Sequence, residues 1–171
     1  MPSDDRAGSL SSPIRAVVSF RHVVGAPPEV VFPLLCPIRE CEWIPGWGGE
    51  VVCSASGVAE RDGVFRAGLS GARATYVVTR YEPPCAIEYL VLSDPALVDA
   101  LALTLEAAPA PAPGGVTALT WRRTFTALAA EGEARVAERA AAFEARVPHL
   151  AELLERYLPN AAGEAKRTFA T

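Results

Sequence analysis

The sequence is poor in residues that bind metals or build disulfide frameworks. Its 171 residues include two histidines, His22 and His149, which lie far apart, and four cysteines that form no C-x-x-C pair. We therefore expect no metal site. The cysteines are interpreted as free, reduced thiols, which is typical of a cytoplasmic protein.

Long apolar runs and an excess of positive charge are missing too. No stretch of about 18 apolar residues is present, so no membrane span is predicted, and residues 1–12 lack the apolar core of a signal peptide. The net charge of −4 and a pI near 5.3 argue against binding to nucleic acid or to an anionic membrane. With neither a Ser-His-Asp set nor a phosphate-binding glycine loop, no cofactor is predicted.

What is present is typical of one globular domain. Half of the residues are apolar and 21% are charged, which allows a substantial core. We expect a flexible leader over residues 1–12, a single domain over 13–159 and a polar tail over 160–171. Alternating apolar residues predict seven strands, at 14–24, 50–55, 64–67, 73–81, 85–92, 97–107 and 116–127. The segment 97–107 also suits a helix, but its strand neighbours favour a strand.

Two short helices are predicted after the first strand. Two prolines followed by Glu29 are typical of a helix start, and this helix reaches about Leu35. Pro37 restarts the chain into a second short helix, at roughly 38–43.

A long amphipathic helix is predicted at the C-terminal end. From about residue 130, apolar residues recur every three or four positions. We expect the helix to end at Pro159-Asn160 and to kink or break just before His149, because Pro148 lies inside it. Such a helix has to bury its apolar stripe against the sheet, and a gap tends to remain between them.

The order of elements and several segments resemble a known superfamily. These segments are APPEVVFPLLCPIRECEWIPGW (26–47), SGVAE (56–60), GVF (63–65), WRRTFTAL (121–128) and HLAELLERYL (149–158). They are similar to the helix-grip superfamily of START-like, SRPBCC or Bet v 1-like proteins, and to its bacterial branch labelled polyketide cyclase/dehydratase and lipid transport. The resemblance covers about residues 14–158.

This resemblance implies an α+β fold in which a curved antiparallel sheet of about seven strands wraps on a long C-terminal helix. It also implies an apolar pocket between the sheet and the helix. Members of the superfamily include lipid carriers, hormone receptors, cyclases, aromatases, oxygenase domains and scaffolds, so the resemblance implies no particular reaction. The C-x-H…C-x-x-H pattern of the oxygenase branch is absent.

The segment 36–47 is the densest mixture of apolar and ionisable residues in the chain. The spacing of Cys36, Glu40, Trp43 and Trp47 allows them to share one face. We expect Trp43 and Trp47 to line the pocket mouth, with Glu40 pointing inward as a ligand anchor or general acid/base. Alternatively, the tryptophans are core residues, and Glu40 bonds a backbone amide or pairs with Arg39.

The last strand supplies a second candidate. Alternation places Leu119, Trp121, Arg123 and Phe125 on its inward face. A buried guanidinium requires a carboxylate, so we predict that Arg123 pairs with Glu40 or with Glu42 across the cavity mouth. The alternative is that Arg123 lies near the strand end and extends to solvent.

Other side chains receive weaker assignments. The predicted ligand-binding residues are Trp43, Trp47, Trp121, Phe125, Tyr89 and Phe143. Glu88 is either a pocket acid or, as is more common at such positions, a solvated residue. His149 is either catalytic or, again more commonly, structural or solvent-facing.

These patterns predict that the protein binds a small hydrophobic molecule, such as a lipid, a polyketide or an aromatic metabolite. One alternative is a cyclase/aromatase or dehydratase-type enzyme with Glu40 and Arg123 as catalytic residues. Another is a non-catalytic scaffold with a filled core. A homodimer remains an open alternative, and the sequence does not identify the ligand.

Overall fold

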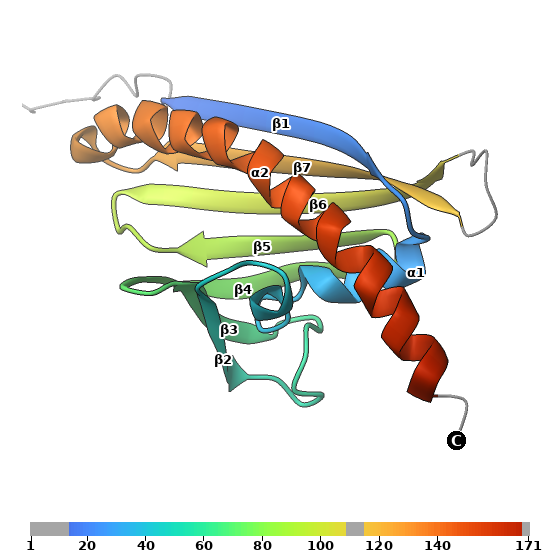
Figure 1. Cartoon of the computed structure of the whole chain (residues 1–171). Helices are drawn as coiled ribbons and strands as arrows, with labels where there is room; N and C mark the ends of the chain where they lie inside the picture. The colour runs from blue at the N-terminus through green and yellow to red at the C-terminus, as the bar shows by residue number, and fades with distance from the viewer. Residues whose placement is uncertain (1–13, 109–114, 169–171) are drawn as a thin grey trace, which may run out of the picture.

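The computed structural model describes residues 14–108 and 115–168, with side chains up to residue 158. The expected leader at 1–12 and most of the proline-rich connection before residue 115 lie outside the described residues. Within them, the chain forms a seven-stranded curved sheet, short helices after the first strand and one long C-terminal helix (Figure 1). The predicted fold is confirmed.

The sheet is antiparallel throughout. Its spatial order is β1-β7-β6-β5-β4-β3-β2, so the only non-sequential pairing joins the first strand to the last among the described residues. Residues 97–107, which also suited a helix, form a strand, because alternation buries the leucines of this segment on one face. The strands are β1 (Arg15–Val24), β2 (Trp47–Cys53), β3 (Val64–Leu69), β4 (Ala72–Glu82), β5 (Ala86–Leu92), β6 (Leu97–Ala108) and β7 (Val116–Ala127).

The inward face of the sheet follows from this period of two. On β7, Leu119, Trp121 and Phe125 are buried, as predicted. On β6, Asp99 has the same parity as the buried leucines and is itself 3% exposed. The concave face therefore carries one acidic residue on an otherwise apolar face of this strand.

The short helices are tighter than expected. The first is a single α-helical turn, α1 (Pro28–Val31), followed by a 3₁₀ turn, η1 (Phe32–Leu35). The second, predicted over 38–43, is only the 3₁₀ turn η2 (Glu40–Glu42). Prolines at 37 and 45 leave too few residues between them to sustain an α-helix, and short 3₁₀ pieces are the usual outcome.

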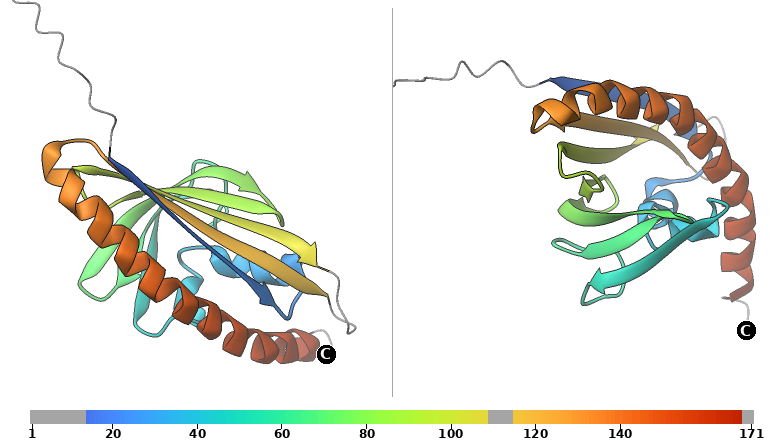
Figure 2. Two further views of the ribbon diagram at one scale, coloured as in Figure 1. Left: turned by 90° about the horizontal axis from the view of Figure 1, so that it is seen from above. Right: turned by 90° about the vertical axis from the view of Figure 1, so that its left-hand side faces the viewer.

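The long helix α2 (Ala130–Thr168) packs on β1 and β7. Its predicted end at Pro159-Asn160 is wrong, because the helix continues to Thr168. The alanines and charged residues after Asn160 are good helix formers and support this continuation. The helix is not broken at Pro148, and Figure 2 shows that it bends along its length to follow the curved sheet.

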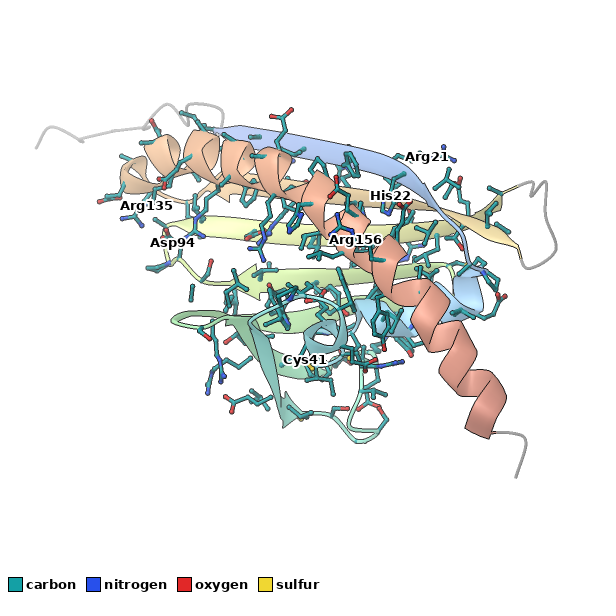
Figure 3. The ribbon with its side chains drawn as sticks, in the orientation of Figure 1. Arg21, His22, Cys41, Asp94, Arg135 and Arg156 are labelled. Carbon is teal, nitrogen blue, oxygen red and sulfur yellow. The ribbon has the colours of Figure 1, made fainter. Side chains whose placement is uncertain are left out.

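The start of α2 is fixed to the turn between β5 and β6. The Arg135 guanidinium donates to both carboxylate oxygens of Asp94, at 2.8 and 2.7 Å (Figure 3). Gly132 permits the close approach, because a Cβ there would lie 2.3 Å from the Ala96 carbonyl oxygen. This attachment sets which face of α2 meets the sheet. Among the described residues, no helix is long and apolar enough to cross a membrane.

Candidate functional site

The segment 36–47 is held by its two tryptophans. The indole Nε1 of Trp47 donates to the Pro37 carbonyl at 2.8 Å, and that of Trp43 donates to the Leu34 carbonyl at 2.9 Å. The strand β2 passes close beside this segment at Gly49, where a Cβ would lie 2.9 Å from the Pro37 carbonyl oxygen. These contacts hold η2 over the concave face of the sheet.

A cavity of about 240 Å³ lies beneath η2, between the sheet and α2. We call it the α2 cavity. Of the eight predicted site residues, six line it. Its main lining residues are Glu40, Ile44 and Trp47 from the η2 region, Tyr76, Leu101, Trp121, Arg123 and Phe125 from the sheet, and Arg139, Ala142, Phe143 and Arg146 from α2.

Trp43 and Tyr89 do not line this cavity. Both are buried in the core, at 5% and 2% exposure, with their polar atoms bonded to the backbone of η1. The Tyr89 hydroxyl donates to the Leu35 carbonyl at 3.0 Å. These two residues support the short helices instead, and this corrects their predicted place in the lining. The expected common face of 36–47 is not formed either, since Cys36 and Glu40 point to different hollows.

Glu40 is the most unusual group in the α2 cavity. It is 8% exposed, and its carboxyl makes no hydrogen bond and no ion pair with any described residue. Burial raises its pKa to about 8, against the opposing fields of Arg146 and Arg123. At neutral pH the carboxyl is therefore mostly protonated, and it can donate a hydrogen bond into the cavity.

Arg123 pairs with Asp99, and the predicted pair with Glu40 or Glu42 is wrong. The two parallel hydrogen bonds, Nε to Oδ1 and Nη2 to Oδ2, measure 2.8 and 2.7 Å. Asp99 is the partner because β6 pairs with β7, which makes the two residues diagonal neighbours on the inward face. The rings of Phe125 and Phe143 lie 5.3 and 5.2 Å from the guanidinium carbon.

Glu42 lies outside the cavity and has its own partners. Its carboxylate accepts two hydrogen bonds from Arg39, at 2.7 and 2.9 Å, and one from the Tyr157 hydroxyl at 2.7 Å. The hydrogen bond from Arg39 holds the pKa of Glu42 below its ordinary value. The hydrogen bond from Tyr157 joins η2 to α2.

Arg139 and Arg146 are cavity residues that the sequence reasoning missed. Neither was among the predicted site residues. They share a face with Phe143, because positions 139, 143 and 146 are spaced by four and three. Neither arginine makes an ion pair with a described residue, and this spacing is the signal that would have identified them.

Other polar groups in or near the cavity also lack hydrogen-bond partners among the described residues. The Tyr76 hydroxyl has no hydrogen-bond partner among the described residues, and burial together with the field of Glu40 raises its pKa. Beside it in the core, the Trp121 indole nitrogen and both ring nitrogens of His22 are buried without a partner in the described part of the chain. The two rings stack at 6.5 Å.

The two doubtful candidates lie outside the cavity. Glu88 faces away from the core on β5 and pairs with Arg80 at 3.1 Å. His149 is exposed on α2, with Nδ1 3.8 Å from a carboxylate oxygen of Glu152. In both cases the solvent-facing alternative describes the observed position.

A second, larger hollow of about 520 Å³ lies between η1 and the β4–β5 turn. We call it the η1 groove. Cys36 lies in its wall, and burial raises the pKa of this thiol, whose sulfur accepts a hydrogen bond from the Ala59 amide at 3.2 Å. The groove is lined by Glu29, Phe32, Pro33, Cys36, Arg39, Val58, Ala59, Tyr81, Pro83, Pro84 and Ile87.

Potential metal ligands do not converge in the described residues. The four cysteines are free thiols, three of them exposed. No group of three or more histidine, cysteine, aspartate or glutamate side chains that could hold a metal ion is found in residues 14–108 and 115–158.

Solved structures share this fold at low sequence identity. XoxI from Bacillus cereus aligns with a TM-score of 0.64 and 12% identity, covering 86% of this chain and 98% of its own. Ara h 8.0201 gives 0.60 and 13%, covering 85% and 99%, and CalU16 from Micromonospora echinospora gives 0.56 and 17%, covering 94% and 97%. At such identities the likeness shows a Bet v 1-like helix-grip fold and nothing further.

The sequence itself places the chain in a family. No curated protein matched it. Residues 15–158, however, match the family described as polyketide cyclase/dehydrase and lipid transport. This match spans well over half of the chain and includes both the concave sheet and the cavity-lining part of α2. The protein therefore belongs to the polyketide cyclase/dehydrase and lipid transport family.

Proposed function

We propose that the protein binds a small, largely apolar molecule in the α2 cavity. The family and the fold suggest binding of hydrophobic ligands in general. The observation that supports this site is its wall, in which aromatic side chains surround a buried carboxyl that has no partner within the described residues. Burying an unpartnered polar group is costly, so such a group is expected to meet a hydrogen-bond acceptor on a ligand.

The size of the cavity limits the ligand. A volume of about 240 Å³ is slightly below the range of about 300–1,000 Å³ that is common for drug-sized ligands. Removing apolar ligand surface from water contributes about 25 cal/mol per Å² before the costs of association. The part of the ligand that the cavity encloses is therefore compact, such as a short lipid chain or an aromatic ring system, and it is oriented by Glu40.

The binding function is tested by native mass spectrometry of gently purified protein and by titration with N-phenyl-1-naphthylamine, a neutral apolar probe. We expect a copurified small molecule or saturable probe binding that changes the fluorescence of Trp47 and Trp121. A protein that carries nothing and does not bind the probe would contradict the proposal. Such a result would favour a scaffold.

A second candidate is an enzyme of cyclase/aromatase or dehydratase type. The protonated state of Glu40 favours it, because a neutral carboxylic acid in an apolar site can act as a general acid toward a carbonyl or a leaving hydroxyl. Arg123 would position the substrate, although Asp99 already neutralises much of its charge. Turnover of a polyketide analogue that survives both Glu40→Gln and Arg123→Ala would contradict this assignment.

A further inference from the structure

The α2 cavity contains more positive charge than its described partners neutralise. Three guanidinium groups and one carboxyl line it. Asp99 neutralises Arg123, whereas Arg139 and Arg146 form no ion pair with any described residue. Glu40 is mostly protonated at neutral pH and does not offset them. Arg139 and Arg146 line the cavity and are also exposed on α2, so they lie where an anionic group of a bound ligand can reach them without being fully buried.

Arg146 is the better placed of the two free cations. The two residues are seven positions apart, which separates their backbones by about 10 Å along the helix axis. Arg146 acts electrostatically on both Glu40 and Tyr76, whereas the field of Arg139 acts on Asp94 at the far end of the sheet. The unpartnered polar groups of the cavity thus lie on the Arg146 side.

We propose that the ligand of the α2 cavity is an apolar molecule with an anionic oxygen head group, and that Arg146 binds this head group. This inference rests on the proposed binding function and adds the class of ligand. The planar guanidinium matches the oxygens of a carboxylate or a phosphate in a bidentate manner. The apolar part of the ligand lies against Trp121, Phe125 and Phe143, and Glu40 donates a hydrogen bond to a ligand oxygen.

The experiment measures displacement of N-phenyl-1-naphthylamine by decanoate, decyl phosphate and decanol, which share one chain and differ in the head group. We expect at least one anion to bind the wild-type protein about 10- to 100-fold more tightly than decanol, as a charge-assisted hydrogen bond contributes this much. The tighter anion identifies the head group. Arg146→Gln is expected to remove the preference, and Arg146→Lys to retain part of it.

Arg156→Gln is the matched control. Arg156 lies on the same helix, is exposed and does not line the cavity (Figure 3), so its replacement is expected to leave the preference unchanged. Equal affinity for decanol and both anions would overturn the inference and leave the binding function intact. A preference that survives Arg146→Gln would overturn the role of Arg146. Failure of the probe and all three competitors to bind would overturn the binding function as well.

Discussion

The two hollows of the protein differ most in the state of their charged groups. The η1 groove, about 520 Å³ in volume, is mainly apolar, and its two charged residues are Arg39, which is paired with Glu42, and Glu29, which is exposed to solvent. The α2 cavity is about half as large, yet its wall includes a buried carboxyl that no described residue pairs, beside two arginines that are exposed on α2. Because folded proteins rarely leave buried polar groups without partners, the unpaired carboxyl of Glu40 identifies a binding site better than the volume does.

The largest loss of stability is expected when the ion pair between Arg123 and Asp99 is broken. Asp99→Asn leaves the mostly buried Arg123 without a counter-charge and should lower the free energy of unfolding by about 3–5 kcal/mol. Urea denaturation measures this loss. The matched variant near the η1 groove is Glu42→Gln, which breaks a half-exposed pair and should cost less than about 1 kcal/mol. Equal losses in the two variants would remove the contrast between the hollows.

The next prediction concerns the pH dependence of the free energy of unfolding that results from the titration of Glu40. Its pKa of about 8 in the folded protein exceeds the ordinary value of 4.5, so the folded state holds an extra proton between these values. The free energy of unfolding therefore falls as the pH rises from about 4.5, and it levels off above about 8. The groups that act on Glu40 or respond to it are Arg123 on β7, Arg146 on α2, Tyr76 on β4, Tyr89 on β5 and Cys36 at the end of η1.

Glu40→Gln should remove this decline, which amounts to roughly 4–5 kcal/mol across that range. Urea melts at several pH values test it, and the advantage of the variant over the wild type should open from about pH 4.5 and reach its full size above about pH 8. Glu42→Gln provides the contrast. The pKa of Glu42 is lowered by Arg39, so its contribution is lost as the pH falls. Parallel wild-type and Glu40→Gln profiles would show that Glu40 is not buried as described.

Filling each hollow separately tests which of them binds the ligand. Ala142 on α2 faces the α2 cavity, and Val58 lines the η1 groove. Ala142→Trp should weaken binding of N-phenyl-1-naphthylamine at least about tenfold, a cost of about 1.4 kcal/mol, because the indole occupies the cavity. Val58→Trp should leave the affinity unchanged. The reverse result would assign binding to the η1 groove and contradict the proposed site.

The fold could be predicted because it depends on local periodicity. Alternation along 116–127 placed Trp121 and Phe125 on the inward face, and both are buried there. The same rule applied to 97–107 would have placed Asp99 beside the leucines, where it is the partner of Arg123. The pattern in the sequence was sufficient, but the prediction placed the carboxylate partner of Arg123 in the segment 36–47.

The details of the site were harder to predict because they depend on distances across the fold. The sequence does not specify that η2 is a single 3₁₀ turn, and this geometry decides that Glu40 reaches the α2 cavity while Cys36 lines the η1 groove. The position of Trp43 depends on its bond to the Leu34 carbonyl, nine residues earlier. Composition and spacing alone could not separate a lining tryptophan from a supporting one.

The smallest predicted change in stability distinguishes two neighbouring tyrosines. The rings of Tyr76 and Tyr89 pack edge to face at 5.9 Å, but Tyr76 lines the cavity and Tyr89 belongs to the core that supports η1. Tyr89→Phe removes the bond to the Leu35 carbonyl and leaves this buried acceptor without its partner, which should cost about 1 kcal/mol. Tyr76→Phe removes a hydroxyl that no described residue bonds, so the free energy of unfolding should change by less than about 0.5 kcal/mol.

Tyr89→Phe should have the larger effect on stability, whereas Tyr76→Phe should have the larger effect on ligand affinity. The Tyr76 hydroxyl faces the same cavity as Glu40 and Arg146, so its loss should weaken binding of the preferred anion, whereas loss of the Tyr89 hydroxyl should act only on stability. Urea melts and probe displacement on both variants measure the two quantities independently. If Tyr76→Phe destabilises the free protein as much as Tyr89→Phe does, its hydroxyl serves the core, and the division between a supporting wall and a binding wall is lost.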